Sequence, residues 1–139
     1  MAYITSKTLQ IIPFRDSKRI RLQNKKIFNE LSGVASKAAT YHPSKTSMSY
    51  RCLQFISPTK LVCAINDRTT RSAYFGIYIL NLEKGWRESV RKLPPRIRGV
   101  TSMDVSHSKR MIAVATSDMA VNIFHMDTFA VLPLEKYLG

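Results

Sequence analysis

The stretch Thr101–Asp127, TSMDVSHSKRMIAVATSDMAVNIFHMD, contains three apolar runs separated by two short polar turns. The runs predict β-strands at Val100–Val105, Met111–Thr116 and Ala120–Met126, and a fourth strand follows at Phe129–Leu132. Four short strands joined by short turns predict an antiparallel meander.

The second and third of these strands are apolar at nearly consecutive positions, over Met111–Ala115 and Ala120–Phe124. A sheet with one face in water would alternate apolar and polar residues, so continuous apolarity predicts that both faces are covered. Antiparallel meanders covered on both faces are typical of β-propellers, where each blade lies between two neighbours.

The same order of strands and turns occurs earlier in the chain. Within Tyr50–Trp86 the pattern predicts strands at Leu53–Ile56, Leu61–Ile65 and Phe75–Asn81, and within Met1–Ile20 it predicts strands at Met1–Thr5 and Leu9–Phe14. In this alignment Ala2, Ala64 and Ala113 take equivalent places. The repetition predicts a repeat architecture that opens at the second strand of its first unit.

We therefore expect an all-β fold, a partial WD-type β-propeller of about two and a half blades in a single domain. The predicted parts are a half blade over residues 1–23, an irregular basic insertion over 24–47, a second blade over 48–98 and a third over 99–134. A propeller needs at least about four blades to close. The chain is therefore expected to form an open arc with an apolar face bare at each end, and to be a portion of a larger propeller.

The last predicted blade resembles a WD-type repeat: Asp118 takes the place of the structural aspartate and Val121–Asp127 that of the third strand. Several segments resemble the late blades of the endoplasmic-reticulum guanine-nucleotide exchange factor for the small GTPase of the COPII coat, the prolactin regulatory element-binding protein family. These segments are GVTSMDV (Gly99–Val105), IAVATSD (Ile112–Asp118), AYITSKTLQII (Ala2–Ile12) and FISPTKLVCA (Phe55–Ala64).

The resemblance implies a seven-bladed propeller on the cytosolic face of the endoplasmic reticulum membrane, anchored by a later single span. Such a protein catalyses GDP release from the coat GTPase in transport from the reticulum to the Golgi. The family's potassium-binding exchange loop belongs to an early blade, upstream of anything that matches Met1, and the final blade and the span would follow Gly139. No family active-site residue therefore carries over, and we expect this chain to be scaffold of the exchange factor.

The charge of the chain favours acidic partners. Its 139 residues include 22 Lys and Arg against 9 Asp and Glu, a formal net charge of +13. No apolar run approaches the ~20 residues of a membrane span. Two alternatives to the exchange-factor scaffold remain open: a generic propeller interaction module with an acidic protein partner, and a basic nucleic-acid-associated protein. Nucleic acid is the less favoured partner because it follows from charge alone.

Two features are candidate sites. The basic run Trp86–Arg98 is a candidate patch for an acidic partner, with a solvated strand and loop as the alternative. Its cations are Arg87, Arg91, Lys92, Arg96 and Arg98. Asp118 is predicted to be structural, because a short turn between two buried strands needs a side chain to satisfy its backbone N–H groups.

No bond-making chemistry is predicted. His42, His107 and His125 lie far apart without carboxylates or cysteines at ligand spacing. Cys52 and Cys63 have no metal spacing and are expected to be reduced thiols, with a disulfide across the turn between them as the alternative. The chain has no glycine-rich phosphate loop, so we predict no catalytic, cofactor or metal site and no enzyme activity of this kind.

Overall fold

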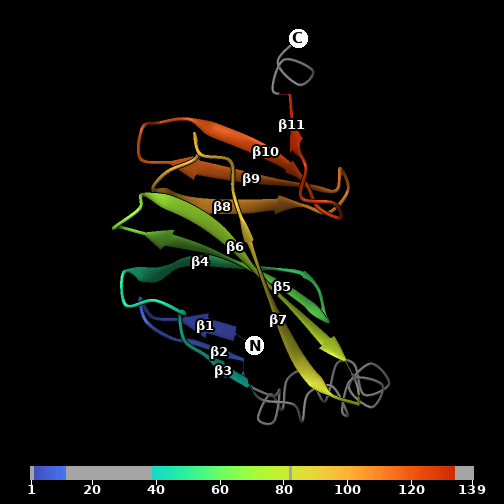
Figure 1. Cartoon of the computed structure of the whole chain (residues 1–139). Helices are drawn as coiled ribbons and strands as arrows, with labels where there is room; N and C mark the ends of the chain where they lie inside the picture. Colours follow the sequence, from blue (N-terminus) through green and yellow to red (C-terminus); the bar gives the residue numbers. More distant parts are fainter. Residues whose placement is uncertain (1, 12–38, 82, 134–139) are drawn as a thin grey trace.

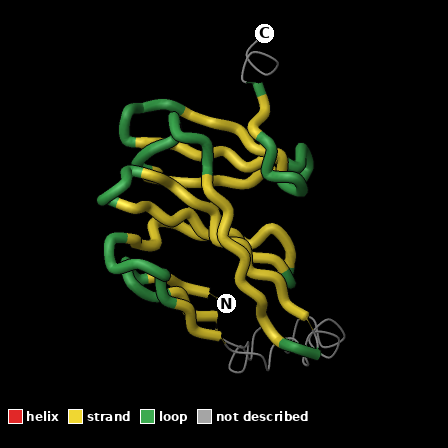
Figure 2. Tube along the Cα trace, in the orientation of Figure 1, coloured by secondary structure: helices red, strands yellow, loops and turns green. Residues whose placement is uncertain are grey.

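A computed structural model of the chain describes residues 2–11, 39–81 and 83–133. In this part of the chain there are eleven strands and no helix, and the strands form three antiparallel sheets (Figures 1 and 2). The expected all-β fold is confirmed. Among these residues no helix is long and apolar enough to cross a membrane.

The first sheet has three strands in the order β1-β2-β3. They are β1 (Ala2–Ile4), β2 (Leu9–Ile11) and β3 (Ala39–Tyr41). β3 lies inside the segment that the sequence predicts to be irregular, and it pairs with β2 through Leu9↔Tyr41 and Ile11↔Ala39. Three residues are too few for alternation to predict a strand from the sequence, and pairing with β2 keeps the β3 segment extended. Residues 12–38, with the rest of Leu9–Phe14 and most of the expected insertion, lie outside the described part.

The second and third sheets are four-stranded meanders, in the orders β4-β5-β6-β7 and β11-β10-β9-β8. The second consists of β4 (Met48–Ser57), β5 (Lys60–Asp67), β6 (Ser72–Asn81) and β7 (Gly85–Lys92). The third consists of β8 (Val100–Ser106), β9 (Met111–Thr116), β10 (Val121–His125) and β11 (Val131–Leu132). Every strand predicted after residue 48 is present, and β9 has the predicted bounds. The fourth strand of the second sheet, β7, was not among the predicted strands; a solvated strand was expected there only as the alternative for the basic run.

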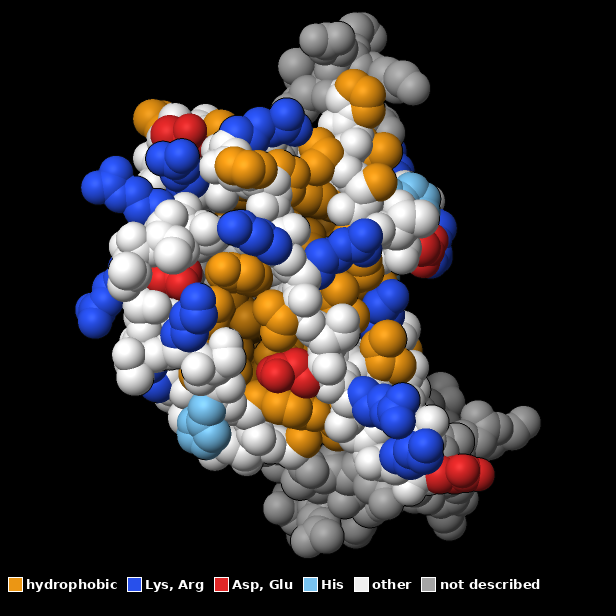
Figure 3. Space-filling view, viewed as in Figure 1, with side chains coloured by type: hydrophobic (Ala, Val, Ile, Leu, Met, Phe, Trp, Pro, Cys, Tyr) orange, Lys and Arg blue, Asp and Glu red, His pale blue; other side chains and the backbone are white. Residues whose placement is uncertain are grey.

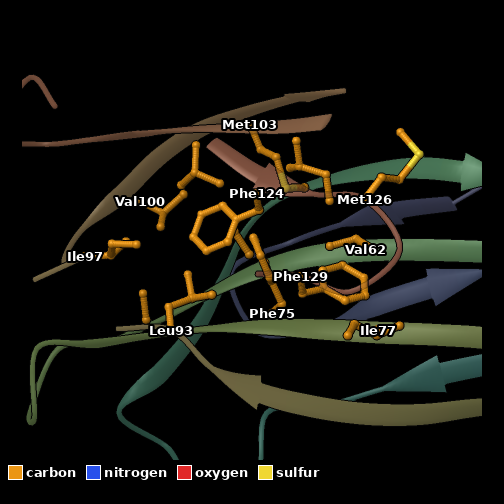
Figure 4. Packing of buried hydrophobic residues seen from close by; sticks show 14 of the residues in the cluster. Val62, Phe75, Ile77, Leu93, Ile97, Val100, Met103, Phe124, Met126 and Phe129 are labelled. Atoms are coloured by element: carbon orange, nitrogen blue, oxygen red, sulfur yellow. The ribbon is translucent and has the colours of Figure 1, made fainter. Parts of the chain in front are cut away.

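The second sheet lies between the other two, and its strand β5 is buried on both faces. All five residues of Leu61–Ile65 are buried, which is consistent with their continuous apolarity. Leu61, Cys63 and Ile65 belong to the apolar cluster shared with the first sheet. Val62 and Ala64 belong to the cluster shared with the third sheet, part of which is drawn in Figure 4.

The sheets meet through their early strands. β4 contacts β8, β5 contacts β8, and β1 contacts β4. Aromatic side chains fill the space between the later strands of the second and third sheets: the ring of Phe75 on β6 lies 5.0 Å from that of Phe124 on β10 and 5.8 Å from that of Phe129 (Figure 4). Because protein interiors are closely packed, large aromatic side chains between the later strands are consistent with a wider separation of the two sheets there than at β4 and β8.

The outer face of the third sheet has no sheet against it among the described residues. Along β9 every second residue is buried, and the residues between are partly exposed. On the neighbouring β10, Val121 is 46% exposed. The continuous apolarity of this stretch predicted that both faces are covered, and for β9 that prediction is wrong among the described residues. One face packs against the second sheet, and no described sheet covers the other.

Candidate binding surface

Five connections lie along one edge of the three sheets, on the left in Figure 1. We call this surface the loop edge. It consists of residues 5–8 between β1 and β2, 42–47 between β3 and β4, 68–71 between β5 and β6, 93–99 between β7 and β8, and 117–120 between β9 and β10. The edge gathers turns that are up to about a hundred residues apart in the sequence because each meander brings alternate turns to the same side.

Hydrogen bonds tie the first three of these loops together. The ammonium of Lys7 donates to the carbonyl oxygens of Thr46 at 2.6 Å and of Met48 at 2.8 Å. The backbone N–H of Arg68 donates to the carbonyl of Ser47, with the nitrogen and oxygen 3.2 Å apart. Lys7 is therefore a link between the first and second sheets.

A second set of bonds ties the connection before β8 to its neighbours. The Asn66 side-chain amide donates to the Val100 carbonyl at 2.9 Å and accepts from the Val100 N–H at 3.0 Å. The Ser117 N–H donates to the Gly99 carbonyl at 2.9 Å. Gly99 has a φ of +64°, and a Cβ there would lie 2.6 Å from the Ser117 hydroxyl oxygen, so this junction requires glycine.

The carboxylate of Asp118 bonds within the β9–β10 turn in which Asp118 lies. Its carboxylate accepts hydrogen bonds from the Thr116 hydroxyl and, at 3.4 Å, from the Ala120 N–H. These two bonds, with that from Thr116 the stronger cause, lower the pKa of Asp118 below its usual value. We interpret Asp118 as a residue that stabilises the β9–β10 turn.

Asp67 has the same role in the β5–β6 turn, and sequence reasoning missed it. It is 2% exposed, and it accepts from the N–H groups of Thr69 at 3.0 Å and Thr70 at 3.4 Å. Burial alone would raise the pKa of Asp67, but hydrogen bonds from the Ser47 hydroxyl and the two threonines hold it below the usual value. The available signal in the sequence was an aspartate, Asp67, that follows the apolar run Leu61–Ile65 after a single asparagine.

The exposed charge of the loop edge is almost entirely positive. Its exposed cations are Lys7, Lys45, Arg68, Arg71, Arg96 and Arg98. Within the described residues none of them forms an ion pair, and Asp118 is the only acidic residue in the five loops. Figure 3 shows Lys and Arg side chains along this margin of the molecule. Unneutralised cations on adjoining rigid loops create a positive potential that attracts acidic surfaces.

The predicted basic run is divided by the fold. Arg96 and Arg98 lie in the connection after β7, where the Arg98 Nε donates to the Pro95 carbonyl at 3.1 Å. That connection joins the loop edge, beside Arg68 and Arg71, which the sequence did not single out. Long-range packing of separate turns brings these four residues to one edge, and no local pattern indicates that Arg68 and Arg71 join Arg96 and Arg98 there.

Arg87, Arg91 and Lys92 lie on β7 itself and are exposed. Arg91 pairs with Phe75 across the sheet, and its Nη1 donates to the Thr128 carbonyl at 2.9 Å. Arg91 therefore joins the second sheet to the third. These three cations belong to a strand, not to the loop edge.

In the described part of the chain no group of three or more His, Cys, Asp or Glu side chains is placed to hold a metal ion. The Nδ1 of His125 accepts a hydrogen bond from the N–H of Asp127 at 3.1 Å, so this ring nitrogen takes part in the β10–β11 turn. Cys52 and Cys63 are free thiols. Burial raises the pKa of Cys52 to about 11, and burial also raises that of Cys63, so both are protonated and weakly nucleophilic at neutral pH.

Comparison with protein-family models found no family that matches this chain, and a search of curated proteins found no match either.

Proposed function

We propose that this chain is a scaffold portion of a WD-type β-propeller that binds an acidic protein partner along its loop edge. The observation that carries the proposal is that exposed cations, which form no ion pair with a described residue, come from separate loops and lie on one edge. Backbone and side-chain hydrogen bonds connect these loops to one another. A rigid basic surface steers an acidic partner toward binding and fixes its orientation.

The stacking of the sheets supports the propeller part of the proposal. Two consecutive four-stranded meanders contact each other through their first strands, β4 and β8, as neighbouring propeller blades do around a central axis. The first sheet corresponds to the second to fourth strands of a blade. In a complete propeller, the outer face of the third sheet would be covered by a further blade.

The family resemblance narrows the partner. The segments Gly99–Val105 and Phe55–Ala64 are similar to late blades of the reticulum exchange factor for the COPII-coat small GTPase. On this basis we propose that the scaffold serves that exchange factor at the cytosolic face of the endoplasmic reticulum, in transport to the Golgi. The partner of the loop edge is then an acidic face of the coat GTPase, or of a protein assembled with it.

An acidic protein fits the loop edge better than nucleic acid does. Proteins that bind single strands combine basic residues with aromatic side chains on which bases stack. The five loops contain no Phe, Tyr or Trp. The loop edge therefore offers charged groups on hydrogen-bonded turns and no stacking surface for bases. Such a surface is complementary to a protein face that carries carboxylates.

The test compares a loop-edge variant with a charge-matched control. Arg68→Glu/Arg71→Glu reverses two exposed charges of the loop edge, and Lys84→Glu/Lys109→Glu reverses two exposed charges in turns elsewhere. Binding of the GDP-bound coat GTPase is measured by biolayer interferometry. We expect the loop-edge variant to bind about tenfold more weakly and the control to stay within about twofold of the natural chain.

Two results would overturn the proposal. Equal weakening by both variants would mean that net charge alone governs binding. Tight binding of a polyuridine RNA that weakens steeply with salt and exceeds GTPase binding would favour the nucleic-acid alternative instead.

A further inference from the structure

A cavity of about 420 Å³ lies between the last strand of the second sheet and the end of the third sheet. Its lining is Arg91, Lys92, Leu93, Pro94, Pro95, Phe124, Phe129 and Val131. Leu93, Phe124 and Phe129 are at most 8% exposed, so the deep part of the cavity is apolar (Figure 4). The volume is within the range of pockets that bind small ligands.

Two cations lie at this apolar cavity, and no acidic residue lines it. The Arg91 guanidinium is held in place by its bond to the Thr128 carbonyl, which uses one of its five N–H donors. Lys92 is exposed and makes no ion pair with a described residue. Figure 3 shows hydrophobic side chains between Lys and Arg side chains where β7 passes the third sheet.

The strand beside the cavity has a free edge. β7 is the last strand in the order of its sheet, and no described strand pairs with its outer edge. Near its start the carbonyl of Trp86 accepts a hydrogen bond from the Tyr41 hydroxyl at 3.0 Å. Six of its eight residues are exposed, among them Arg87, Arg91 and Lys92, with Glu88 as the only acid. A basic edge resists pairing with another copy of itself and is complementary to an acidic extended segment.

We propose that this cavity and the adjoining edge of β7 bind a short acidic segment of a partner protein. One leucine or phenylalanine side chain of the segment enters the cavity against Phe124 and Phe129. Its neighbouring carboxylates pair with Arg91 and Lys92, and its main chain extends along β7 in the manner of an added strand. The Arg91–Thr128 bond and Pro94-Pro95 hold the lining rigid before binding, which lowers the entropy lost on association.

This site adjoins the loop edge through Leu93, Pro94 and Pro95, but its two cations lie on β7, outside that edge. It therefore does not depend on the function proposed above, and the two sites fail independently in the following test.

The probe is a fluorescein-labelled heptapeptide with a central leucine and three aspartates on each side, measured by fluorescence anisotropy with the full chain. Two control peptides replace the leucine by serine or all the aspartates by asparagine. We expect the leucine peptide to bind at least about tenfold more tightly than either control, because each control lacks one of the two interactions.

Three protein variants locate the site. Lys92→Glu is expected to weaken the leucine peptide about tenfold, and Val131→Phe, which fills the cavity, to weaken the leucine peptide and leave the serine peptide unchanged. Lys109→Glu, with the same charge change in the turn between β8 and β9, outside both proposed surfaces, should stay within about twofold of the natural chain. Far-UV circular dichroism establishes that each variant is folded, and Lys92→Glu decides the outcome if Val131→Phe does not fold.

Equal affinity for the leucine and serine peptides would overturn the proposal, because the cavity would then contribute nothing. Unchanged binding by Lys92→Glu, or equal weakening by Lys109→Glu and Lys92→Glu, would also overturn it, since the peptide would then lie elsewhere or respond only to net charge.

Discussion

One pair of substitutions tests whether the third sheet is covered on one face only. Ile112 on β9 is fully buried and belongs to the cluster shared with the second sheet. Ile123 on the neighbouring β10 pairs with Ala113 and lies on the other face, where it is partly exposed. Ile112→Val and Ile123→Val remove the same methylene from the two faces of one sheet.

The expected difference follows from burial. Removing a fully buried methylene loses about 0.8 kcal/mol of transfer free energy, and Ile→Val in packed cores lowers the free energy of unfolding by about 0.5–1.5 kcal/mol. We expect a loss in that range for Ile112→Val. Because Ile123 is partly in water in the folded state, Ile123→Val should lower the free energy of unfolding by less than about 0.5 kcal/mol.

The measurement is urea unfolding at equilibrium, followed by far-UV circular dichroism at two protein concentrations tenfold apart. Both substitutions keep a β-branched residue, so strand propensity is matched. An equal loss at the two positions would refute the argument that the outer face is uncovered. If the loss at Ile123 also grew with protein concentration, a second copy of the chain would be the covering partner.

Two further predictions concern single side chains. In Gly76→Ala the new Cβ would lie 2.7 Å from the Tyr78 hydroxyl oxygen, so overpacking should lower the free energy of unfolding by about 1–3 kcal/mol. Adding Tyr78→Phe, which removes that hydroxyl, should restore part of the loss. An unchanged urea midpoint for Gly76→Ala would contradict this prediction. Since the pKa of Asp118 is held below its usual 3.8, its hydrogen bonds stabilise the fold above that pH and are lost as the pH falls through the lowered pKa. Asp118→Ala should therefore unfold at a lower temperature than the natural chain at neutral pH, with the gap closing below about pH 3.8; a gap that stays constant into acid would show that the carboxylate is not involved.

Much of the strand order could be predicted because it is a local property. β9 was predicted with its bounds, because its five apolar residues and one threonine have a polar turn before them and another after them. Leu61–Ile65 was predicted as a strand, and the structure shows it buried on both faces. The sequence predicted such two-sided cover for Met111–Ala115 instead, where the structure covers one face. β3 was not predicted, because three residues carry too little periodicity and its pairing with β2 joins positions about thirty residues apart.

The candidate surfaces were less accessible to sequence reasoning. The basic run that ends at Arg98 was visible as a cluster in the sequence, but the fold divides it between β7 and the loop edge. Arg68 and Arg71 join Arg96 and Arg98 because separate hairpins turn at the same edge. Asp67 resembles Asp118 in chemistry, yet only its burial and its two amide bonds identify it as structural.

The sequence by itself determined the class of the fold, the two meanders and the excess of positive charge, because apolar alternation, turn residues and composition act over a few neighbouring positions. Only the tertiary structure decided which faces are covered and which cations share a surface. β5 and β9 are similarly apolar, but β5 lies between two sheets and β9 has one sheet beside it. That difference depends on what packs from elsewhere in the chain, and no local pattern contains it.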